Sequence, residues 1–304
     1  MAAPLPEDST DIASLPPLRE LIAAHRLAAR KGLGQHFLLD LNLTARIARI
    51  AGRLEERTVI EVGPGPGGLT RAILRAGARR VIAIEKDLRC RGALASLEEA
   101  ARGRLVLVEA DALEVHEPEL LTQVGVPLQG IMLISNLPYN VATVLLVKWM
   151  RQIAASPQLY ERLVVTLQKE VAERLFARPR TKAYGRLSVL CQWLTEVEPC
   201  FEISPRAFTP PPRVTSTVVR MTPRPIPLAP APWAEFEEVT RAAFGQRRKM
   251  LRTSLRAATP GAPTEPLIAA AGLAPTARAE ELTVPAFAAL ARALAADKAR
   301  QAQR

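Results

Sequence analysis

TVIEVGPGPGGLTRAILRAG (58–77) decides the fold of this chain. Its first residues form an apolar run rich in β-branched side chains, which predicts a buried strand. From Gly68 the apolar residues recur at helical spacing until Gly77, which predicts a helix that ends at this glycine. A glycine-rich turn joins the strand to the helix, and this arrangement is typical of the first unit of a doubly wound α/β sheet.

The same alternation of strand and helix continues after this stretch. Further nearly continuous apolar runs predict strands at residues 80–87, 104–113, 131–136 and 162–168. Two more strands are expected at 198–204 and 214–221, joined by a segment too short for a helical crossover, so they should pair antiparallel at one edge. The expected fold class is α/β, a Rossmann-like parallel sheet with an antiparallel edge strand.

Composition divides the chain into four parts. Residues 1–20 predict a flexible arm, and residues 21–222 carry the alternating pattern of the main domain. Five prolines lie within residues 222–233, so we expect 223–233 to be an extended linker. Residues 234–304 are rich in Ala, Arg, Leu and Glu at helical spacing and predict a small all-helical C-terminal domain.

The charge balance indicates a polyanionic partner. The 304 residues include 41 Lys and Arg against 30 Asp and Glu, a formal net charge of +11. Nucleic acid is the common partner of such a chain, and an anionic membrane surface is a less common one. We expect no transmembrane helix and no secretory signal. The three cysteines and three histidines are widely spaced, which predicts neither disulfides nor a metal site and favours a cytoplasmic location.

The glycine turn also predicts the kind of ligand. Gly63, Gly65 and Gly68 match the G-x-G-x-x-G pattern of dinucleotide sites. However, Pro64 and Pro66 each remove a backbone N–H that a diphosphate would need. The turn therefore suits a cofactor that approaches the backbone closely and carries no phosphate, and S-adenosylmethionine fits this description. An NAD site and a plain turn without a ligand are the alternatives.

Two carboxylates are predicted at the same edge of the sheet. Glu85 lies 22 residues after Gly63, where an acid can accept both hydroxyls of a ribose. Asp111 follows the next strand, where its carboxylate could accept the exocyclic amine of adenine. Taken singly, each would be interpreted as a solvated loop residue. Because the carboxyl ends of parallel strands meet at one edge, the pair favours a cofactor site.

The tetrapeptide N-L-P-Y (136–139) ends the strand at 131–136 on this edge. The amine of adenine is a weak nucleophile, because its lone pair is delocalised into the ring. The side-chain oxygen of Asn136 and the carbonyl of Leu137 could hold its N–H groups, while Pro138 stiffens the turn. Tyr139 would stack on the base, so catalysis would be mainly positioning. A structural turn with a half-buried tyrosine is the alternative.

Six segments together carry a family resemblance. They are GQHFL (34–38), EVGPGPGGLT (61–70), VIAIEKD (81–87), EADAL (109–113), SNLPYN (135–140) and AFTPPPRVTSTVV (207–219). Their order and spacing resemble those of the ribosomal RNA adenine N6-dimethyltransferases, in particular the bacterial small-subunit branch, over about residues 25–256. The resemblance implies a class I methyltransferase fold. It also implies dimethylation of two adjacent adenines in the hairpin near the 3′ end of 16S rRNA, on small ribosomal subunit particles, as part of ribosome biogenesis.

The resemblance further implies roles for individual residues. The cofactor contacts fall on His36, Leu38, Gly63, Glu85, Asp111 and Asn136. The family usually has Asn where this chain has His36, so a backbone or imidazole contact is expected in place of an amide contact. Phe208 matches the aromatic residue that the family places on the other face of the target base, and a core phenylalanine is the alternative.

A basic segment predicts the RNA contacts. RAAFGQRRKMLRTSLR (241–256) contains six basic residues and no acid. On a continuous helix, Phe244, Leu251 and Leu255 would pack on the domain beside a basic face. The predicted contacts, mostly to phosphate, are Arg241, Arg247, Arg248, Lys249, Arg252 and Arg256. The patch could be extended by Arg26, Arg30 and Lys31. A merely solvated face is the alternative.

Two rival functions stay open. One is a resistance-type enzyme that methylates an adenine of large-subunit rRNA, and the other is a non-catalytic RNA-binding factor in ribosome assembly. The proline-rich segment and the helical tail of about 70 residues favour the small-subunit enzyme. Intact Gly63, Glu85, Asp111 and N-L-P-Y argue against a loss of catalysis. We expect a monomer, because no exposed apolar repeat indicates otherwise.

Overall fold

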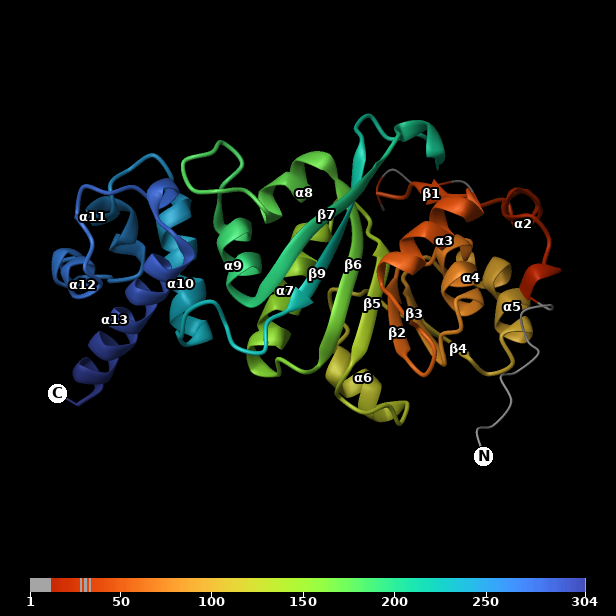
Figure 1. Cartoon of the computed structure of the whole chain (residues 1–304), viewed down its shortest axis with the longest axis horizontal. Coiled ribbons are helices and arrows are strands. Elements are labelled where there is room, and N and C mark those ends of the chain that lie inside the picture. Colours follow the sequence, from red (N-terminus) through yellow and green to blue (C-terminus); the bar gives the residue numbers. More distant parts are fainter. Residues whose placement is uncertain (1–11, 28, 30–31, 33, 304) are drawn as a thin grey trace. The chain divides into compact units, whose positions relative to one another are not determined.

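The computed structural model describes residues 12–27, 29, 32 and 34–303, and within them the strands form a seven-stranded sheet and a two-stranded sheet. In the larger sheet the order is β4-β3-β2-β5-β6-β9-β7 (Figure 1). Its strands are β2 (Thr58–Val62), β3 (Arg80–Glu85), β4 (Leu105–Glu109), β5 (Ile131–Asn136), β6 (Tyr160–Gln168), β7 (Thr195–Ile203) and β9 (Ser216–Pro223). Strands β2 to β6 pair in parallel, and β9 pairs antiparallel with β6. The predicted α/β sheet with an antiparallel edge is confirmed.

The helices alternate with these strands and then continue alone toward the C-terminus. They are α2 (Leu18–Ala24), α3 (Leu41–Ile50), α4 (Gly68–Arg75), α5 (Cys90–Ala100), α6 (Glu117–Gln123), α7 (Ala142–Ala155), α8 (Lys169–Leu175), α9 (Arg186–Leu194), α10 (Trp233–Gly245), α11 (Leu251–Ser254), α12 (Glu265–Ala270) and α13 (Val284–Ala302). Asp40 caps α3, because its Oδ1 accepts the N–H groups of Asn42 and Leu43 at 2.8 and 3.2 Å.

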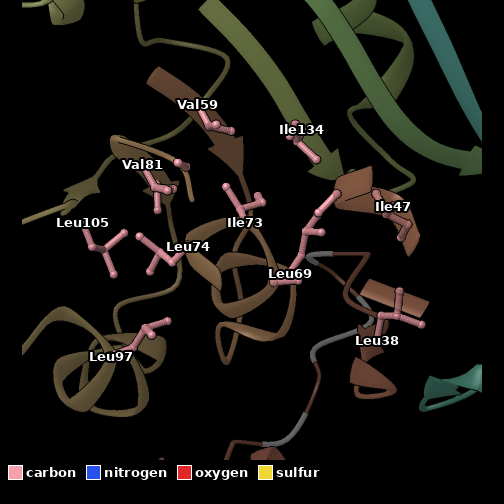
Figure 2. Close-up of a cluster of buried hydrophobic side chains, with 14 of the residues drawn as sticks. Leu38, Ile47, Val59, Leu69, Ile73, Leu74, Val81, Leu97, Leu105 and Ile134 are labelled. Atoms are coloured by element: carbon pink, nitrogen blue, oxygen red, sulfur yellow. The ribbon is translucent and has the colours of Figure 1, made fainter. Parts of the chain in front are cut away.

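The core of the sheet is built against α4, whose apolar residues follow the helical spacing of the sequence. Figure 2 shows Ile73 of α4 beside Val59 of β2 and Val81 of β3, and Leu69 of α4 belongs to the same cluster. Ile73, Val59 and Val81 are fully buried. Each such side chain contributes roughly 1.5–3 kcal/mol of burial free energy, so this cluster holds α4 and the turn before it firmly on the sheet.

The order of the strands reverses beside β2. The chain passes from β2 outward to β3 and β4, and then returns to the other side of β2 with β5. The parallel registers Val59↔Met132 and Ile60↔Leu133 bring the ends of β2 and β5 together. In open α/β sheets, ligands bind outside the carboxyl ends of the strands at such a reversal. The glycine turn and Asn136 therefore meet where a ligand site is expected.

A two-stranded sheet joins two of the quoted motifs. Strand β1 (Phe37–Leu38) pairs antiparallel with β8 (Phe208–Thr209), and Leu38 lies opposite Phe208. The segment GQHFL is thereby fastened to AFTPPP, which lies far from it in the sequence. Neither strand is predicted above, because two residues are too few to show a periodic pattern.

The chain divides into two compact units. The first holds residues up to 145 together with 158–169 and 198–222, and the second holds 146–157, 170–197 and residues from 223 onward. Residues 170–197 were predicted to belong to the main domain with the sheet, but this segment groups with the C-terminal helices. The reason is burial of aromatic groups, since the ring of Trp193 stacks on Phe236 at 3.8 Å between centroids.

Two other segments are more tightly packed than predicted. The proline-rich segment 223–233 lies against α9, because the Trp193 indole donates to the Ala229 carbonyl at 2.7 Å. Of the predicted flexible arm, residues 12–20 pack on the first unit, with Ile12 and Leu18 buried. The Arg71 guanidinium donates to the Pro16 carbonyl at 2.8 Å. Residues 1–11 lie outside the described residues.

Candidate active site

A pocket lies outside the carboxyl ends of β2, β3, β4 and β5 in the first unit. The predicted residues that line it are His36, Leu38, Gly63, Glu85, Asp111, Asn136, Leu137, Pro138 and Tyr139. The structure therefore brings all six predicted cofactor contacts and the N-L-P-Y tetrapeptide to one place. The role of each residue stays a prediction.

The turn after β2 needs glycine for two different reasons. Gly63, with a φ of +70°, adopts a left-handed conformation that other residues rarely take. At Gly68, a Cβ atom would lie 2.6 Å from the carbonyl oxygen of Leu38, so only glycine lets β1 approach α4. Pro64 and Pro66 supply no N–H to this turn. The turn therefore allows close backbone approach but offers few donors to a phosphate.

Glu85 ends β3 and holds the glycine turn. Its Oε2 accepts the Gly65 N–H at 3.0 Å, and its Oε1 accepts the Asp87 N–H at 2.8 Å. Burial raises the pKa of Glu85, and these N–H groups oppose the rise. Each carboxylate oxygen keeps a second lone pair. The fixed carboxylate can therefore accept two further donors, such as neighbouring hydroxyls.

Asp111 lies two residues after β4 and is already engaged by protein groups. Its Oδ1 accepts the Leu113 N–H at 2.9 Å, and its Oδ2 lies 2.5 Å from Lys86 Nζ. The Lys86 side chain is 61% exposed, so solvent screens this ion pair and it contributes little to stability. A ligand amine could replace the ammonium group at little cost. This contact with Lys86 was not predicted from the sequence.

Glu61 is a pocket residue that the sequence analysis missed. It lies inside β2, is 1% exposed, and its Oε2 has no hydrogen-bond partner among the described residues. Burial raises the pKa of Glu61 to about 8, and the charge of Glu85 adds to the rise. The signal was present as an acid within the apolar run TVIEV. Burying such a group is unfavourable, and strongly perturbed acids in clefts mark candidate functional sites.

Asn136 ends β5 with its amide held and its oxygen unsatisfied. Its Nδ2 donates to the His36 carbonyl at 3.1 Å, which assigns the orientation of the amide. Its buried Oδ1 has no partner within the described part of the chain. An unsatisfied buried acceptor costs about 1–3 kcal/mol, which a ligand N–H can recover. The pocket therefore contains a positioned acceptor for an amine.

Leu137 and Pro138 fasten the tetrapeptide between the core and the glycine turn. The Leu137 side chain is buried. Pro138 lies against Gly63, where a Cβ atom would be 3.4 Å from Pro138 Cγ. The backbone that carries the Leu137 carbonyl is therefore held on both sides.

Tyr139 is held at its hydroxyl and on its ring. The hydroxyl lies 2.6 Å from Ser216 Oγ, and the ring centroid lies 5.1 Å from that of His36 at an interplanar angle of 32°. Because a carbonyl oxygen can only accept, His36 Nδ1 donates to the Pro210 carbonyl, at 2.8 Å. His36 therefore acts twice, because its carbonyl orients Asn136 and its imidazole packs on Tyr139.

Phe208 is the one predicted catalytic residue that does not line this pocket. Its ring is 2% exposed and belongs to the hydrophobic core, together with Leu38 and Ile47. This is the core position named above as the alternative. The stacking role of Phe208 on a base stays a prediction.

The prediction of one basic helix over 241–256 is wrong. Helix α10 ends at Gly245, and Gln246, with a φ of −132°, lies outside the helical region. The backbone then leaves the axis of α10, because the Leu251 N–H donates to the Ala277 carbonyl at 2.8 Å. Glycine favours this break, and the tertiary contact decides where the next helix begins. The basic residues therefore do not share one helical face.

The predicted RNA contacts have different surroundings. Exposed side chains belong to Arg241, Arg248, Lys249, Arg252 and Arg256. Two of them, Arg252 and Arg256, line a common hollow of about 370 Å³ in the second unit. Arg247 is only 32% exposed and pairs with Glu280 at 2.9 Å. Arg26 is exposed, and Arg30 and Lys31 lie outside the described residues.

The described residues contain no cluster of His, Cys, Asp and Glu that could hold a metal ion. No helix among them combines the length and the apolar character that a membrane span requires. Burial raises the pKa of the Cys90 thiol to about 12.

The parallel sheet, the glycine turn and the strand-end carboxylates define a class I methyltransferase fold. The chain belongs to the ribosomal RNA adenine dimethylase family, whose family model matches residues 26–296. A protein of Rhodospirillum rubrum called ribosomal RNA small subunit methyltransferase A is 60% identical over 280 residues, which are 92% of this chain and 93% of that protein. The protein of the same name from Paramagnetospirillum magneticum is 57% identical over 283 residues, 93% of this chain and 96% of that one.

Solved structures agree with this fold. A dimethyladenosine transferase from Plasmodium falciparum superposes with a TM-score of 0.66 at 21% identity, over 84% of this chain and 96% of that one. The 23S rRNA methyltransferase ErmE superposes with a TM-score of 0.58 at 26% identity, over 85% of this chain and 99% of that one.

Proposed function

We propose that this protein transfers methyl groups from S-adenosyl-L-methionine to N6 of adenine in ribosomal RNA, two to each base. The targets are two adjacent adenines in the hairpin near the 3′ end of 16S rRNA, presented on small ribosomal subunit particles. The protein would act as a monomer in the cytoplasm, during ribosome biogenesis. The observation that carries the proposal is the buried, unsatisfied Oδ1 of Asn136 within a pocket that suits a methyl donor.

The residues of the pocket fit S-adenosyl-L-methionine better than a phosphate-containing cofactor. Glu85 and Asp111 line the pocket, and their carboxylates favour a cation such as a sulfonium or an ammonium group and disfavour a diphosphate. Pro64 and Pro66 remove two donors that a diphosphate would need. Glu85 can accept the ribose hydroxyls, and Asp111 the adenine amine. These observations support the cofactor assignment without a bound ligand.

The residues around N6 would prepare the nitrogen for methylation. When bound, the cofactor supplies an electrophilic methyl group on a sulfonium. Asn136 Oδ1 and the Leu137 carbonyl accept the N6–H groups, which turns the nitrogen toward tetrahedral geometry and frees its lone pair. Tyr139 stacks on the base and holds it in place.

The reaction then needs position more than acid or base. With the cofactor bound, a new N–C bond would form while the C–S bond breaks, and the electron pair of the C–S bond would stay on sulfur. The nitrogen becomes cationic and loses its proton to solvent, so no strong general base is required. Holding the two reacting atoms in line supplies most of the rate enhancement.

The choice of substrate is supported by the basic surface and by the relatives. The exposed arginines and lysine of 241–256 can neutralise phosphates, and the net charge of +11 attracts RNA over a distance. The two relatives named small subunit methyltransferase A are 60% and 57% identical, whereas the enzyme named for 23S rRNA is 26% identical. These values favour the small subunit over the large one.

The test is transfer of tritiated methyl groups to undermodified small subunits, naked 16S rRNA and large subunits, followed by nucleoside identification. We expect dimethyladenosine on small subunits, formed far more slowly by Asn136→Ala and at an unchanged rate by the control Asn42→Ala, which alters an exposed residue of α3. Label on large subunits would assign the protein to the 23S alternative. Absence of label on all three substrates, with measurable cofactor binding, would refute the enzymatic proposal and favour the assembly-factor alternative.

A further inference from the structure

A basic loop in the second unit was not singled out in the sequence analysis. We define it as residues 178–182 within FARPRTKAY (176–184), a segment without an acidic residue. The side chains of Arg178, Arg180 and Lys182 are all exposed. Among the described residues, no carboxylate forms an ion pair with any of the three. The loop therefore carries three cations that protein groups do not neutralise.

The ends of this loop are fastened to the second unit. Gln192 of α9 donates from its side-chain amide to the carbonyls of Leu175 and Ala177, both at 2.9 Å. At the other end, the buried Tyr184 hydroxyl donates to the Leu282 carbonyl at 2.7 Å. Both contacts reach the loop from segments that are distant in sequence, so its position is fixed by the tertiary structure.

The middle of the loop is held in a conformation that it would not adopt alone. Arg180 has a φ of +70°, which is unfavourable for a residue with a side chain. Its N–H donates to the Glu280 carbonyl at 2.7 Å. The Thr181 hydroxyl donates to the Arg178 carbonyl at 2.7 Å. An unfavourable backbone persists only where the surroundings hold it, so these bonds keep the cations in place.

Arg247 supplies the central support of the loop. Its Nη1 donates to the Lys182 carbonyl at 2.6 Å, and its Nη2 donates to the Thr181 carbonyl at 2.8 Å. Its Nε donates to Glu280 Oε2 at 2.9 Å. All three nitrogens of the guanidinium are therefore engaged by the protein. A lysine would keep the charge but could not reproduce this planar set of bonds.

We propose that the basic loop is a phosphate-contacting surface for the RNA substrate, and that Arg247 is a positioning residue for this loop and not itself an RNA contact. The inference rests on the proposed function, which supplies an RNA substrate. Three unpaired cations on one short segment match the repeating charges of an RNA backbone. Because the loop is already ordered, little conformational entropy is lost on binding. The contacts add affinity and no base specificity.

The test is equilibrium binding to undermodified small ribosomal subunits at KCl concentrations from about 0.05 to 0.4 M. Over this range the Debye length falls from about 14 Å to about 5 Å, so the screening of charges varies strongly. A plot of the logarithm of the association constant K against the logarithm of the salt concentration has a negative slope. In the variant Arg178→Ala/Arg180→Ala/Lys182→Ala the magnitude of this slope should fall by about 3. Binding at 0.1 M salt should weaken by about 100-fold or more, because each phosphate contact releases about one counterion.

A charge-matched control separates local contacts from the loss of net charge. The control is Arg53→Ala/Arg75→Ala/Arg79→Ala, which removes three exposed arginines of the first unit. The slope of this control should change by less than 1. An equal loss in both triple variants would overturn the proposal, because only net charge would then matter. Cofactor titration and the methylation rate at saturating substrate check that each variant is folded.

Arg247→Lys tests the positioning role. It keeps the charge, yet binding should weaken by about 10-fold or more and amide hydrogen exchange at residues 178–184 should rise. In the loop-triple background, Arg247→Lys should change binding by less than 2-fold, because the cations that it positions are absent. An equal loss in both backgrounds would show that Arg247 contacts RNA itself and would overturn its assignment.

The failure of this inference is distinguishable from the failure of the proposed function. If wild type binds and methylates small subunits and the loop-triple variant does so with the same salt slope, the inference alone is wrong. If wild type neither binds nor methylates them, both are wrong.

Discussion

Replacing Glu61 by glutamine should remove a pH-dependent loss of stability. Glu61 is 1% exposed within β2, and burial raises its pKa from 4.5 to about 8. Glutamine has nearly the same shape and does not titrate in this range. We therefore expect Glu61→Gln to be more stable than wild type at neutral pH and nearly equal to it near pH 4.5.

The sign and size follow from proton linkage. Between pH 4.5 and about 8, the folded protein keeps a proton that the unfolded chain has released. The free energy of unfolding therefore falls as the pH rises, by about 1.4 kcal/mol per pH unit from this group. The loss amounts to about 3 kcal/mol from pH 5 to pH 7, and it levels off at about 5 kcal/mol above pH 8.

The measurement is urea unfolding of wild type and Glu61→Gln at pH 5, 6 and 7, compared as a difference at each pH. Glu99→Gln, which removes an exposed carboxylate of α5, is the matched control. The difference between Glu61→Gln and wild type should grow with pH, and the control should stay parallel to wild type. Parallel curves for Glu61→Gln would show that Glu61 is already ionised in the folded protein and would refute the argument from burial.

Three further predictions concern the site and its support. Asn136→Ala should slow methyl transfer by about 100-fold or more, because one N6–H acceptor is lost, while the cofactor affinity should fall less. Single-turnover transfer and cofactor titration measure these two effects. An unchanged transfer rate would contradict the mechanism. Tyr139→Phe should lower the unfolding free energy by about 1 kcal/mol, because the hydrogen bond to Ser216 is lost. Its transfer rate should stay within about 10-fold of wild type. A loss of transfer rate as large as in Tyr139→Ala would implicate the hydroxyl in the reaction. Asp40→Ala should lower the unfolding free energy by about 1 kcal/mol through loss of the α3 cap, without changing methyl transfer. Thermal denaturation measures this effect. A denaturation curve that matches wild type would show that the cap contributes nothing to stability.

Features of the site that depend on contacts between distant segments were not predicted from the sequence. The pairing of β1 with β8 joins Leu38 to Phe208 across most of the first unit, and no local pattern indicates it. The same pairing carries Phe208 into the core and away from the pocket lining. Glu61 was missed because periodicity treats an acid within a strand as an interruption, whereas the folded sheet encloses it completely.

The basic segment shows the same limit. Helical spacing predicted one continuous face over 241–256, but the bond from Leu251 to Ala277 begins a new helix beyond Gly245. Arg247 was grouped with its neighbours by charge alone. Its three bonds to Thr181, Lys182 and Glu280 appear only when these segments are brought together.

By itself, the sequence determined the doubly wound sheet, the order of its strands and helices, and the edge at which Gly63, Glu85, Asp111 and Asn136 meet. These features follow from local periodicity and from the rule that parallel strands end at one edge, so they need no knowledge of distant contacts. Only the tertiary structure decided which side chains are buried, held or unsatisfied. Burial and hydrogen-bond partners depend on segments that are far apart in the chain, and these set the pKa of Glu61, the free oxygen of Asn136 and the role of Arg247.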